Sequence, residues 1–398
     1  MRMDYITAAE AAEKWGVAIR QVQRLLMAGR IRGAQKYHRS WMIPASAEKP
    51  GDPRLDKTRG KTSLSEDLDY VIESTITPWP RDNPDAILDT VSQPRLRLQY
   101  EGELAYMRGD FERVKACFRE IGRDDAARLR ACPLTIAAAI CTGDYALYTE
   151  IEAYLKGFIE SDISLDVVAF AELALNTAYV SAIAPNMVVG WLVNGDFSAL
   201  HARAKLDAAY KRAKYFQGIG EFMSMLAVAE TALAFFESED GINFDCITLR
   251  MVCAMACYEL GRFGDAKSHL LHVMGVALPH GFITPFAEAA TALGSLMEQC
   301  FEPRFHDCYD AVMRQWKRTF ANWIDFHNRF TKDNIKSILS IQDYEIARYA
   351  ARGDSDAEIA KQVHLAVGTV RNRLQSIYDT LSIDKKHTRR KELVKYIL

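Results

Sequence analysis

The sequence has no apolar run long enough to cross a membrane. A membrane-spanning helix needs about 20 consecutive apolar residues, and the nearest stretch, FITPFAEAATALGSLM, has Glu288 in its middle. The N-terminal residues include Glu10 and Glu13, where an export signal would be basic and apolar. The eight cysteines lack the spacing of a disulfide framework. We therefore expect a cytoplasmic protein with reduced thiols and no membrane partner.

The sequence also lacks the patterns of an active site or a metal centre. GKT at 60–62 ends like a phosphate-binding loop, but Leu55 stands where that loop needs its first glycine. Zinc-binding CxxC pairs are absent, and Cys253 and Cys257, one helical turn apart, are typical of a buried helix face. No histidine has a catalytic partner at a recognisable spacing. We expect no cofactor, no bound metal and no enzymatic activity.

Charge is distributed unevenly along the chain. The formal net charge is −2. Counting Lys and Arg against Asp and Glu, residues 1–61 carry about +7, residues 332–398 about +4, and the middle about −13. Two basic ends around an acidic centre predict two regions that contact nucleic acid and a body that avoids it.

Residues 50–90 are predicted to be a linker. The stretch 50–63 is rich in Pro, Gly, Lys and Arg, and PWPRDNP at 78–84 holds three prolines, which exclude a helix interior. From 91 to 331, apolar residues recur with helical spacing and β-branched runs are few. The sequence therefore predicts a long all-α region after the linker.

That all-α region contains a repeated turn pattern. A glycine, a polar residue and then Phe or Tyr precede amphipathic segments at four positions: Gly109, Gly143, Gly195 and Gly261. The first two glycines are 34 residues apart, and the last two are separated by close to twice that period. The pattern resembles degenerate tetratricopeptide repeats, in which stacked helix pairs bury their apolar faces. The resemblance implies an α-solenoid whose concave surface takes a small molecule, a peptide or another subunit.

The last part of the chain is predicted to form three short helices with an exposed polar face on the third. Gly353 ends the first helix, and Ser355 or Asp356 caps the second. On the third helix, over 368–381, an apolar stripe is formed by Val370, Leu374, Ile377 and Leu381. The outward side chains are Thr369, Arg371, Asn372, Arg373 and Gln375. These types bind base edges and phosphates, so the helix is predicted to enter the major groove of double-stranded DNA.

Residues 337–398 resemble the LuxR-type helix-turn-helix domain. The matching features are the Leu-Ser opening, the glycine after the first helix, EIA, GTV and the trailing IY…L, and the spacing from Leu339 to Ile383 has no gap. The resemblance implies a four-helix DNA-binding domain. Its last helix, RRKELVKYIL, normally forms a dimer contact, so a homodimer is expected, although DKKHTR before it is longer than usual.

The chain departs from that family at three core or cap positions. Ala366 stands where a capping serine is usual, which predicts a loss of about 1 kcal/mol of helix stability. Ala347 and Ala350 replace leucines, which predicts a smaller and less stable core.

The first 49 residues predict two helices followed by a β-hairpin. Thr7 and Glu10 form a capping box, and Gly16 provides the turn. The second helix directs Val22, Leu25 and Leu26 inward and leaves outward Arg20, Gln21, Gln23 and Arg24. RIRGAQK and SWMI alternate as two strands around a turn at 37–39, which places Lys36 and Arg39 for phosphate contact.

This N-terminal segment resembles the winged helix-turn-helix of the excisionase/MerR type. The matching residues are the IT opening, EAA, WGV, the glycine of AGRI, Gly33 and the closing W-x-I-P, whereas Ala18 and His38 depart from the pattern. The resemblance implies DNA binding. Some domains of this type bind proteins instead, so that alternative stays open.

The sequence predicts a mainly α protein with four parts: a winged helix-turn-helix over 1–49, a linker over 50–90, a tetratricopeptide-like α-solenoid over 91–331, and a four-helix LuxR-type domain over 337–398. The expected function is that of a bacterial transcriptional regulator that binds DNA at its ends and senses or assembles through its centre. The alternative is a scaffold or antirepressor whose terminal domains bind protein partners.

Overall fold

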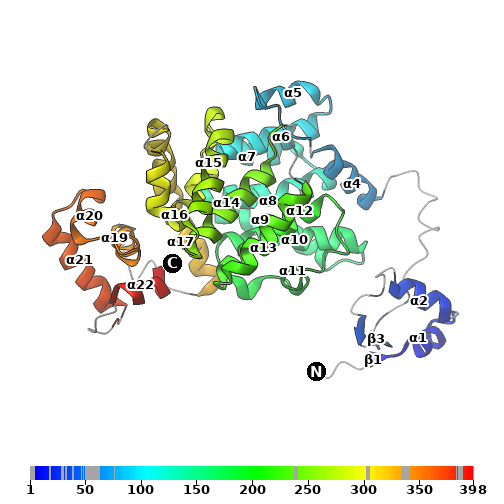
Figure 1. The fold of residues 1–398 in the computed structure, drawn as a ribbon. Coiled ribbons are helices and arrows are strands. Elements are labelled where there is room, and N and C mark those ends of the chain that lie inside the picture. Colours follow the sequence, from blue (N-terminus) through cyan, green and yellow to red (C-terminus); the bar gives the residue numbers. More distant parts are fainter. Residues whose placement is uncertain are drawn as a thin grey trace.

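The computed structural model shows a mainly α protein whose helices pack in sequential pairs (Figure 1). It describes residues 5–17, 19–27, 31, 34–37, 40–45, 47, 49, 63–75, 77–236, 241–301, 305–332, 341–381, 383 and 389–397. No helix within these residues has the length and hydropathy needed to span a membrane.

The N-terminal unit (5–47) combines two helices with a small antiparallel sheet. Its elements are β1 (Tyr5–Ile6), α1 (Ala8–Trp15), α2 (Ile19–Met27), β2 (Gln35–Tyr37) and β3 (Ser40–Pro44). The predicted hairpin is β2 and β3, and the sheet gains β1, so that the strand order is β1-β3-β2. Two residues are too short for an alternating pattern, so the sequence did not reveal β1. The predicted capping box is present, because the Thr7 and Glu10 side chains each accept the other's backbone N–H.

Residues 63–90 are not a linker, which corrects the prediction for 50–90. Helix α4 (Leu64–Ser74) begins after the capping residue Ser63 and buries Leu68, Val71 and Ile72. That stripe contacts α8 and α10. A short 3-10 turn, η1 (Pro84–Ala86), and α5 (Ile87–Thr90) follow. Acidic residues between the apolar positions of α4 made its helical spacing hard to recognise in the sequence. Residues 50–62 of the predicted linker lie outside the described part.

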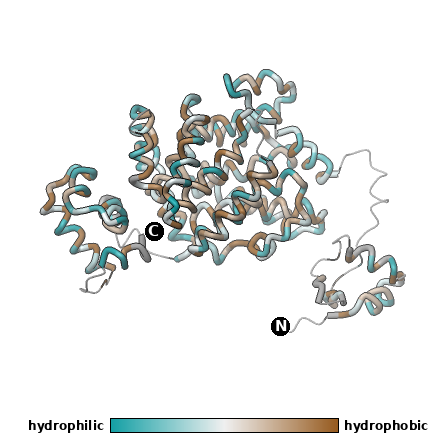
Figure 2. Tube along the Cα trace, viewed as in Figure 1, coloured by the Kyte–Doolittle hydropathy of each residue, from teal (hydrophilic) through white to brown (hydrophobic). Residues whose placement is uncertain are grey.

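Residues 63–332 form one helical body. After α5 its α-helices are α6 (Pro94–Met107), α7 (Phe111–Ile121), α8 (Asp125–Thr142), α9 (Tyr145–Ile159), α10 (Leu165–Ser181), α11 (Gly190–Asn194), α12 (Ala204–Gly218), α13 (Phe222–Phe236), α14 (Phe244–Glu259), α15 (Phe263–Ala277), α16 (Thr284–Phe301) and α17 (His306–Thr331). Two more 3-10 turns are η2 (Pro185–Met187) and η3 (Leu278–His280). Apolar and polar residues alternate along these helices, as the hydropathy colouring shows (Figure 2).

Three of the four predicted glycine turns join two helices of a pair. Gly109, Gly143 and Gly261 have φ values of 77°, 71° and 73° and separate α6 from α7, α8 from α9 and α14 from α15. Such positive φ values favour glycine. The third predicted repeat is wrong, because residues 196–203 after Gly195 form no helix. Asp196 there accepts hydrogen bonds from the backbone and hydroxyl of Ser198, which favours a turn.

The body closes on itself instead of remaining an open curved stack. Helices α6, α8, α10, α12, α14 and α16 each contact the next in that order, and α16 also contacts α6. At this closing contact, the backbone N–H of Ile283 donates to the carbonyl of Met107 at 2.8 Å. The Thr284 hydroxyl donates to the carbonyl of Tyr106 at 2.5 Å. The six inner helices therefore form a ring.

Helix α17 fastens that ring by crossing the C-terminal ends of three inner helices. Asn322 donates to the carbonyl of Cys141 at the end of α8, at 2.9 Å, and the Trp323 indole donates to that of Ser181 at the end of α10, at 2.7 Å. Arg318 donates to the carbonyl of Gly109 at 3.3 Å. The last carbonyls of a helix have no partner within it, so α17 supplies donors for the ends of α8 and α10 and for the turn that follows α6.

The C-terminal unit (341–397) packs against this body. It contains α19 (Ile341–Ala351), α20 (Asp356–Gln362), α21 (Val367–Thr380) and α22 (Arg389–Ile397), and α19 contacts the other three. Ala347 and Ala350 are fully buried, at the positions where the sequence predicted a smaller core. The buried residues of this unit and those of α14–α17 belong to one continuous cluster.

Candidate nucleic-acid interface

Helices α20 and α21 are joined by a tight turn. The hydroxyl of Ser355 accepts from the backbone N–H of Glu358 at 3.3 Å, and the Glu358 carboxylate accepts from the Ser355 N–H at 2.7 Å. His364 has a φ of 53° between the helices. Helix α21 begins after Ala366, whose methyl side chain makes no capping hydrogen bond. The start of α20 therefore has a side-chain cap, whereas the start of α21 has none.

Helix α21 has one buried and one exposed face. Val370, Leu374 and Ile377 are buried in the core of the unit, and Leu381 packs partly buried at its end. On the opposite face, four of the predicted side chains are exposed: Thr369, Arg371, Asn372 and Gln375. The two faces follow from the 3.6-residue period of the helix.

The two arginines of α21 differ in their surroundings. The side chain of Arg371 is 71% exposed, and its Nε lies 3.0 Å from a carboxylate oxygen of Asp356 on α20. Exposed ion pairs of this kind contribute about 0–1 kcal/mol, so Arg371 can exchange Asp356 for a phosphate or a base. Arg373 is half as exposed, and its Nη1 donates to Asp343 on α19 at 2.7 Å. Arg373 therefore braces α21 against α19.

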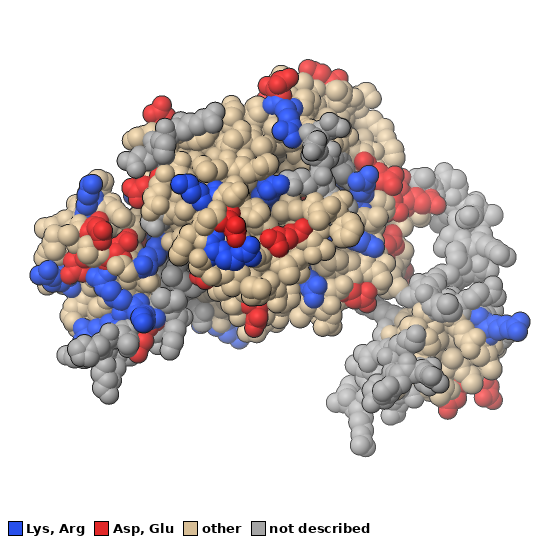
Figure 3. Space-filling view, viewed as in Figure 1, with Lys and Arg blue, Asp and Glu red and all other residues tan. Residues whose placement is uncertain are grey.

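The edge of α21 is extended by basic residues that the sequence did not single out. Arg389 donates to Gln375 at 3.0 Å, and the Gln375 amide donates to Asp379 at 2.8 Å. Arg390 lies 2.5 Å from Asp356. The space-filling view shows Lys and Arg interleaved with Asp and Glu over this unit (Figure 3). Both arginines belong to α22, which lies beside α21 in the folded protein. The spacing of residues within α21 therefore could not identify them.

The N-terminal candidates lie on α2 and on the hairpin. Arg20 and Gln23 are exposed on α2. Gln21 and Arg24 lie on the same helix, but their side chains are outside the described part. Lys36 lies in β2 opposite Trp41, with its side chain outside the described part, and Arg39 lies outside it entirely. The core beneath α2 is formed by Ala11, Ala12, Val22, Leu26, Ile31 and Ile43.

The residues that sequence analysis considered for metal binding lie in the core. Cys253 and Cys257 are fully buried, and burial raises the pKa of the Cys257 thiol. Within the described residues, no three His, Cys, Asp or Glu side chains are grouped so that they could hold a metal ion. The cysteines thus have a packing role in this helix.

The chain was compared with known proteins at three levels. No family model, no curated protein and no solved structure matches it. A functional interpretation therefore depends on the geometry of its own residues.

Proposed function

We propose that this protein is a DNA-binding transcriptional regulator whose C-terminal unit is a LuxR-type helix-turn-helix domain. The observation that supports this most is the exposed polar face of α21 opposite its buried stripe. An α-helix fits the major groove of B-DNA. Arg371, Asn372 and Thr369 are side-chain types that contact guanine, adenine and phosphate there.

The polar side chains of α21 and α22 have different roles in this proposal. Arg371 contacts a guanine or a phosphate, and Asn372 contacts an adenine. Arg373 is hydrogen-bonded to Asp343 and thereby orients α21. To contact a phosphate it must first break its bond to Asp343. Arg389 and Arg390 of α22 extend the phosphate contact along the groove edge.

The N-terminal unit is proposed to be a second DNA-binding domain, of the winged helix-turn-helix type. Its two helices followed by an antiparallel hairpin support this assignment. Helix α2 would enter a groove with Arg20 and Gln23 exposed. A protein partner for this unit remains the second candidate, because its hairpin could equally support a binding surface.

The helical body is proposed to be a tetratricopeptide-like sensor or assembly domain, and the whole protein a cytoplasmic homodimer without enzymatic activity. Sequential helix pairs with glycine turns support the repeat assignment. The acidic middle of the sequence would keep the body off the DNA.

The proposal is tested by selecting sites for the full-length chain from a pool of random double-stranded DNA. We expect an enriched sequence, and affinity for it that falls steeply with salt. Arg371→Ala should weaken binding at least tenfold and lower the salt slope by about one unit. Asn372→Ala should relax the preference at one base pair, by about 1–3 kcal/mol, with an unchanged slope.

Arg123→Ala is the matched control, because Arg123 is an exposed arginine of the helical body. It should bind the selected DNA as the unmodified chain does. If no sequence is enriched, or if Arg371→Ala and Arg123→Ala behave alike, α21 is not the DNA-contacting helix.

A further inference from the structure

The inner helices line a pocket of about 260 Å³ that is open to solvent on one side. Helix α17 also contributes to its wall. Seven aromatic rings line it, from α6, α12, α13, α14 and α17: Tyr106, Tyr210, Phe222, Phe244, Trp316, Phe320 and Trp323. Aromatic faces bind apolar groups and also attract cations. The cavity is therefore suited to a small ligand with an apolar body.

The charged groups of the cavity favour a positively charged ligand. Four carboxylates and two lysines line it. Lys211 pairs with Asp207, and Lys214 donates to the amide oxygen of Gln217. Glu288 accepts a hydrogen bond from the Tyr106 hydroxyl, and its side chain is exposed to solvent, so a ligand can reach its carboxylate.

The surroundings of these carboxylates make a cationic partner favourable. Burial raises the pKa of Glu288, while its bond to Tyr106 and the charge of Lys214 act against that shift. Burial together with neighbouring Asp207 raises the pKa of Asp245 to about 7. A carboxylate in such surroundings gains more from a nearby cation than one in water does.

We propose that this cavity binds a small organic cation, an amine carried on an apolar or aromatic body, with Glu288 as its anionic partner. This deepens the proposed function, since it names the class of ligand that the sensor domain takes. The ammonium group hydrogen-bonds Glu288, and the rings around it enclose the apolar body.

The wall of the cavity is also the surface that holds the C-terminal unit. Helix α16 is broken at Gly294, whose φ of 45° and ψ of −122° interrupt the helical hydrogen bonds. The carbonyl of Ala290 accepts from Arg348 of α19 at 2.8 Å, and the carbonyl of Thr291 accepts from Arg352. Any side chain at Gly294 would overlap the guanidinium of Arg352.

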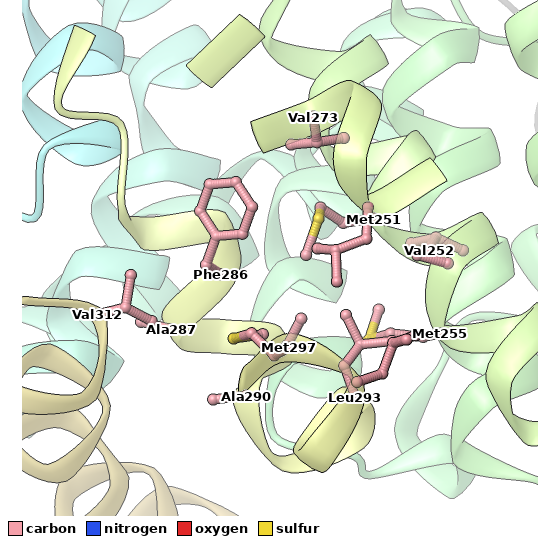
Figure 4. Packing of buried hydrophobic residues seen from close by; sticks show 14 of the residues in the cluster. Met251, Val252, Met255, Val273, Phe286, Ala287, Ala290, Leu293, Met297 and Val312 are labelled. Atoms are coloured by element: carbon pink, nitrogen blue, oxygen red, sulfur yellow. The ribbon is translucent and has the colours of Figure 1, made fainter. Parts of the chain in front are cut away.

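Thr291 connects the two sides of this wall. Its hydroxyl accepts from the Trp316 indole at 3.1 Å, and both residues line the cavity. Its carbonyl, as above, holds Arg352. Beyond the kink, α16 packs against methionines of α14, Met251 and Met255 (Figure 4). Methionine adapts its shape readily, so α16 can shift here without leaving a cavity in the core.

The charges beside this wall predict whether a bound ligand strengthens or weakens the contact between α19 and α16. Arg348 is buried and Arg352 beside it is half-buried, and burial with the charge of Arg348 lowers the pKa of Arg352 to about 10. Glu259 lines the cavity, and its charge stabilises Arg352 across the wall. A cation in the cavity offsets the charge of Glu259 and repels both arginines. Ligand binding thus weakens the docking of α19 on α16.

The ligand is tested with three probes of similar shape: 2-phenylethylamine, 2-phenylethanol and 3-phenylpropionate. Titration calorimetry on the full-length chain should show saturable binding of the amine, at least tenfold tighter than of the other two. Glu288→Gln should remove this preference. Glu230→Gln changes an exposed glutamate of α13 and should leave the preference intact.

No saturable binding of the amine, equal binding of all three probes, or an unchanged preference in Glu288→Gln overturns the cavity assignment. No DNA enters this experiment, so its outcome is independent of the DNA-binding proposal.

The coupling is tested by hydrogen exchange of the backbone amides in α19. The amine should speed exchange in Ile341–Ala351 about threefold or more and leave α1 unchanged. Arg352→Gln should speed it without ligand, and Arg123→Gln should not. Circular dichroism of the Arg352→Gln variant checks that the body remains helical. Unchanged or slower exchange with bound amine overturns the coupling.

Discussion

The two ends of the chain carry related helix pairs but are attached to the molecule differently. The N-terminal unit has a core of its own, built from α1, α2 and β3. The core of the C-terminal unit continues into α14–α17. Among the described residues, the first unit shares no buried cluster with the body. Because its core continues into the body, the C-terminal unit can respond directly to a change there.

The largest effect is expected from removing one buried side chain from each of the two cores. Ile346→Ala and Leu26→Ala each remove a buried side chain, at a cost of about 2–5 kcal/mol. Ile346→Ala should lower the protection of amides in α19–α22 and also in α16 and α17. Leu26→Ala should affect only residues 5–47. Hydrogen exchange measured in low denaturant distinguishes the two patterns, and loss confined to 341–397 in Ile346→Ala would contradict a continuous core.

A second effect comes from the carboxylate of Asp245 in the body. Its raised pKa, about 7 against an ordinary 3.8, means that the folded protein keeps a proton which the unfolded chain loses. This contribution to stability is present below about pH 4 and is lost as the pH rises towards 7. Asp245→Asn should therefore stabilise the body at pH 7 by about 1 kcal/mol or more, and by little at pH 4.

The pH effect of Asp245 is also expected to differ between the two ends of the chain. Thermal unfolding of Asp245→Asn at both pH values, followed by hydrogen exchange, should show the gain in α14–α19 and none in the N-terminal unit. Asp310→Asn, at an exposed aspartate of α17, is the control. An equal gain at pH 4 and pH 7 would mean that Asp245 does not carry the effect.

The smallest expected effects concern the helix caps at the two ends. Thr7→Ala and Ser355→Ala each break a capping box and should cost about 1 kcal/mol. Ala366→Ser supplies the cap that α21 lacks and should add about 0.5–1 kcal/mol. Thermal unfolding of the three variants measures these shifts. No gain in Ala366→Ser would show that the start of α21 is held by packing alone.

Local patterns in the sequence predicted the local features of the fold. The turns at Gly109, Gly143 and Gly261, the capping box of Thr7 and the buried stripe of α21 all follow from spacing within one or two helices. Their causes, a positive φ, a side-chain cap and a 3.6-residue period, lie within a few residues of one another.

Features that depend on residues far apart in the chain could not be predicted this way. The closure of α16 onto α6 joins residues more than 170 positions apart, as in the bond from Thr284 to Tyr106. Arg348 and Arg352 have the sequence pattern of exposed basic residues, yet Arg348 is buried and Arg352 half-buried against α16. The helical period predicted the exposure of Thr369, Arg371, Asn372 and Gln375, but it could not predict the bond from Arg373 to Asp343 on another helix.

Because α16 and α17 complete the ring, the ring can form only after they have been translated. Helices α6 to α15 emerge from the ribosome first and can stack as pairs. The cavity does not exist until α16 and α17 have been translated, because they supply Glu288, Trp316 and Trp323. The helices of the C-terminal unit are translated after them. A nascent chain therefore completes its proposed ligand site just before the helices that depend on it, and a chain ending before α16 would have neither.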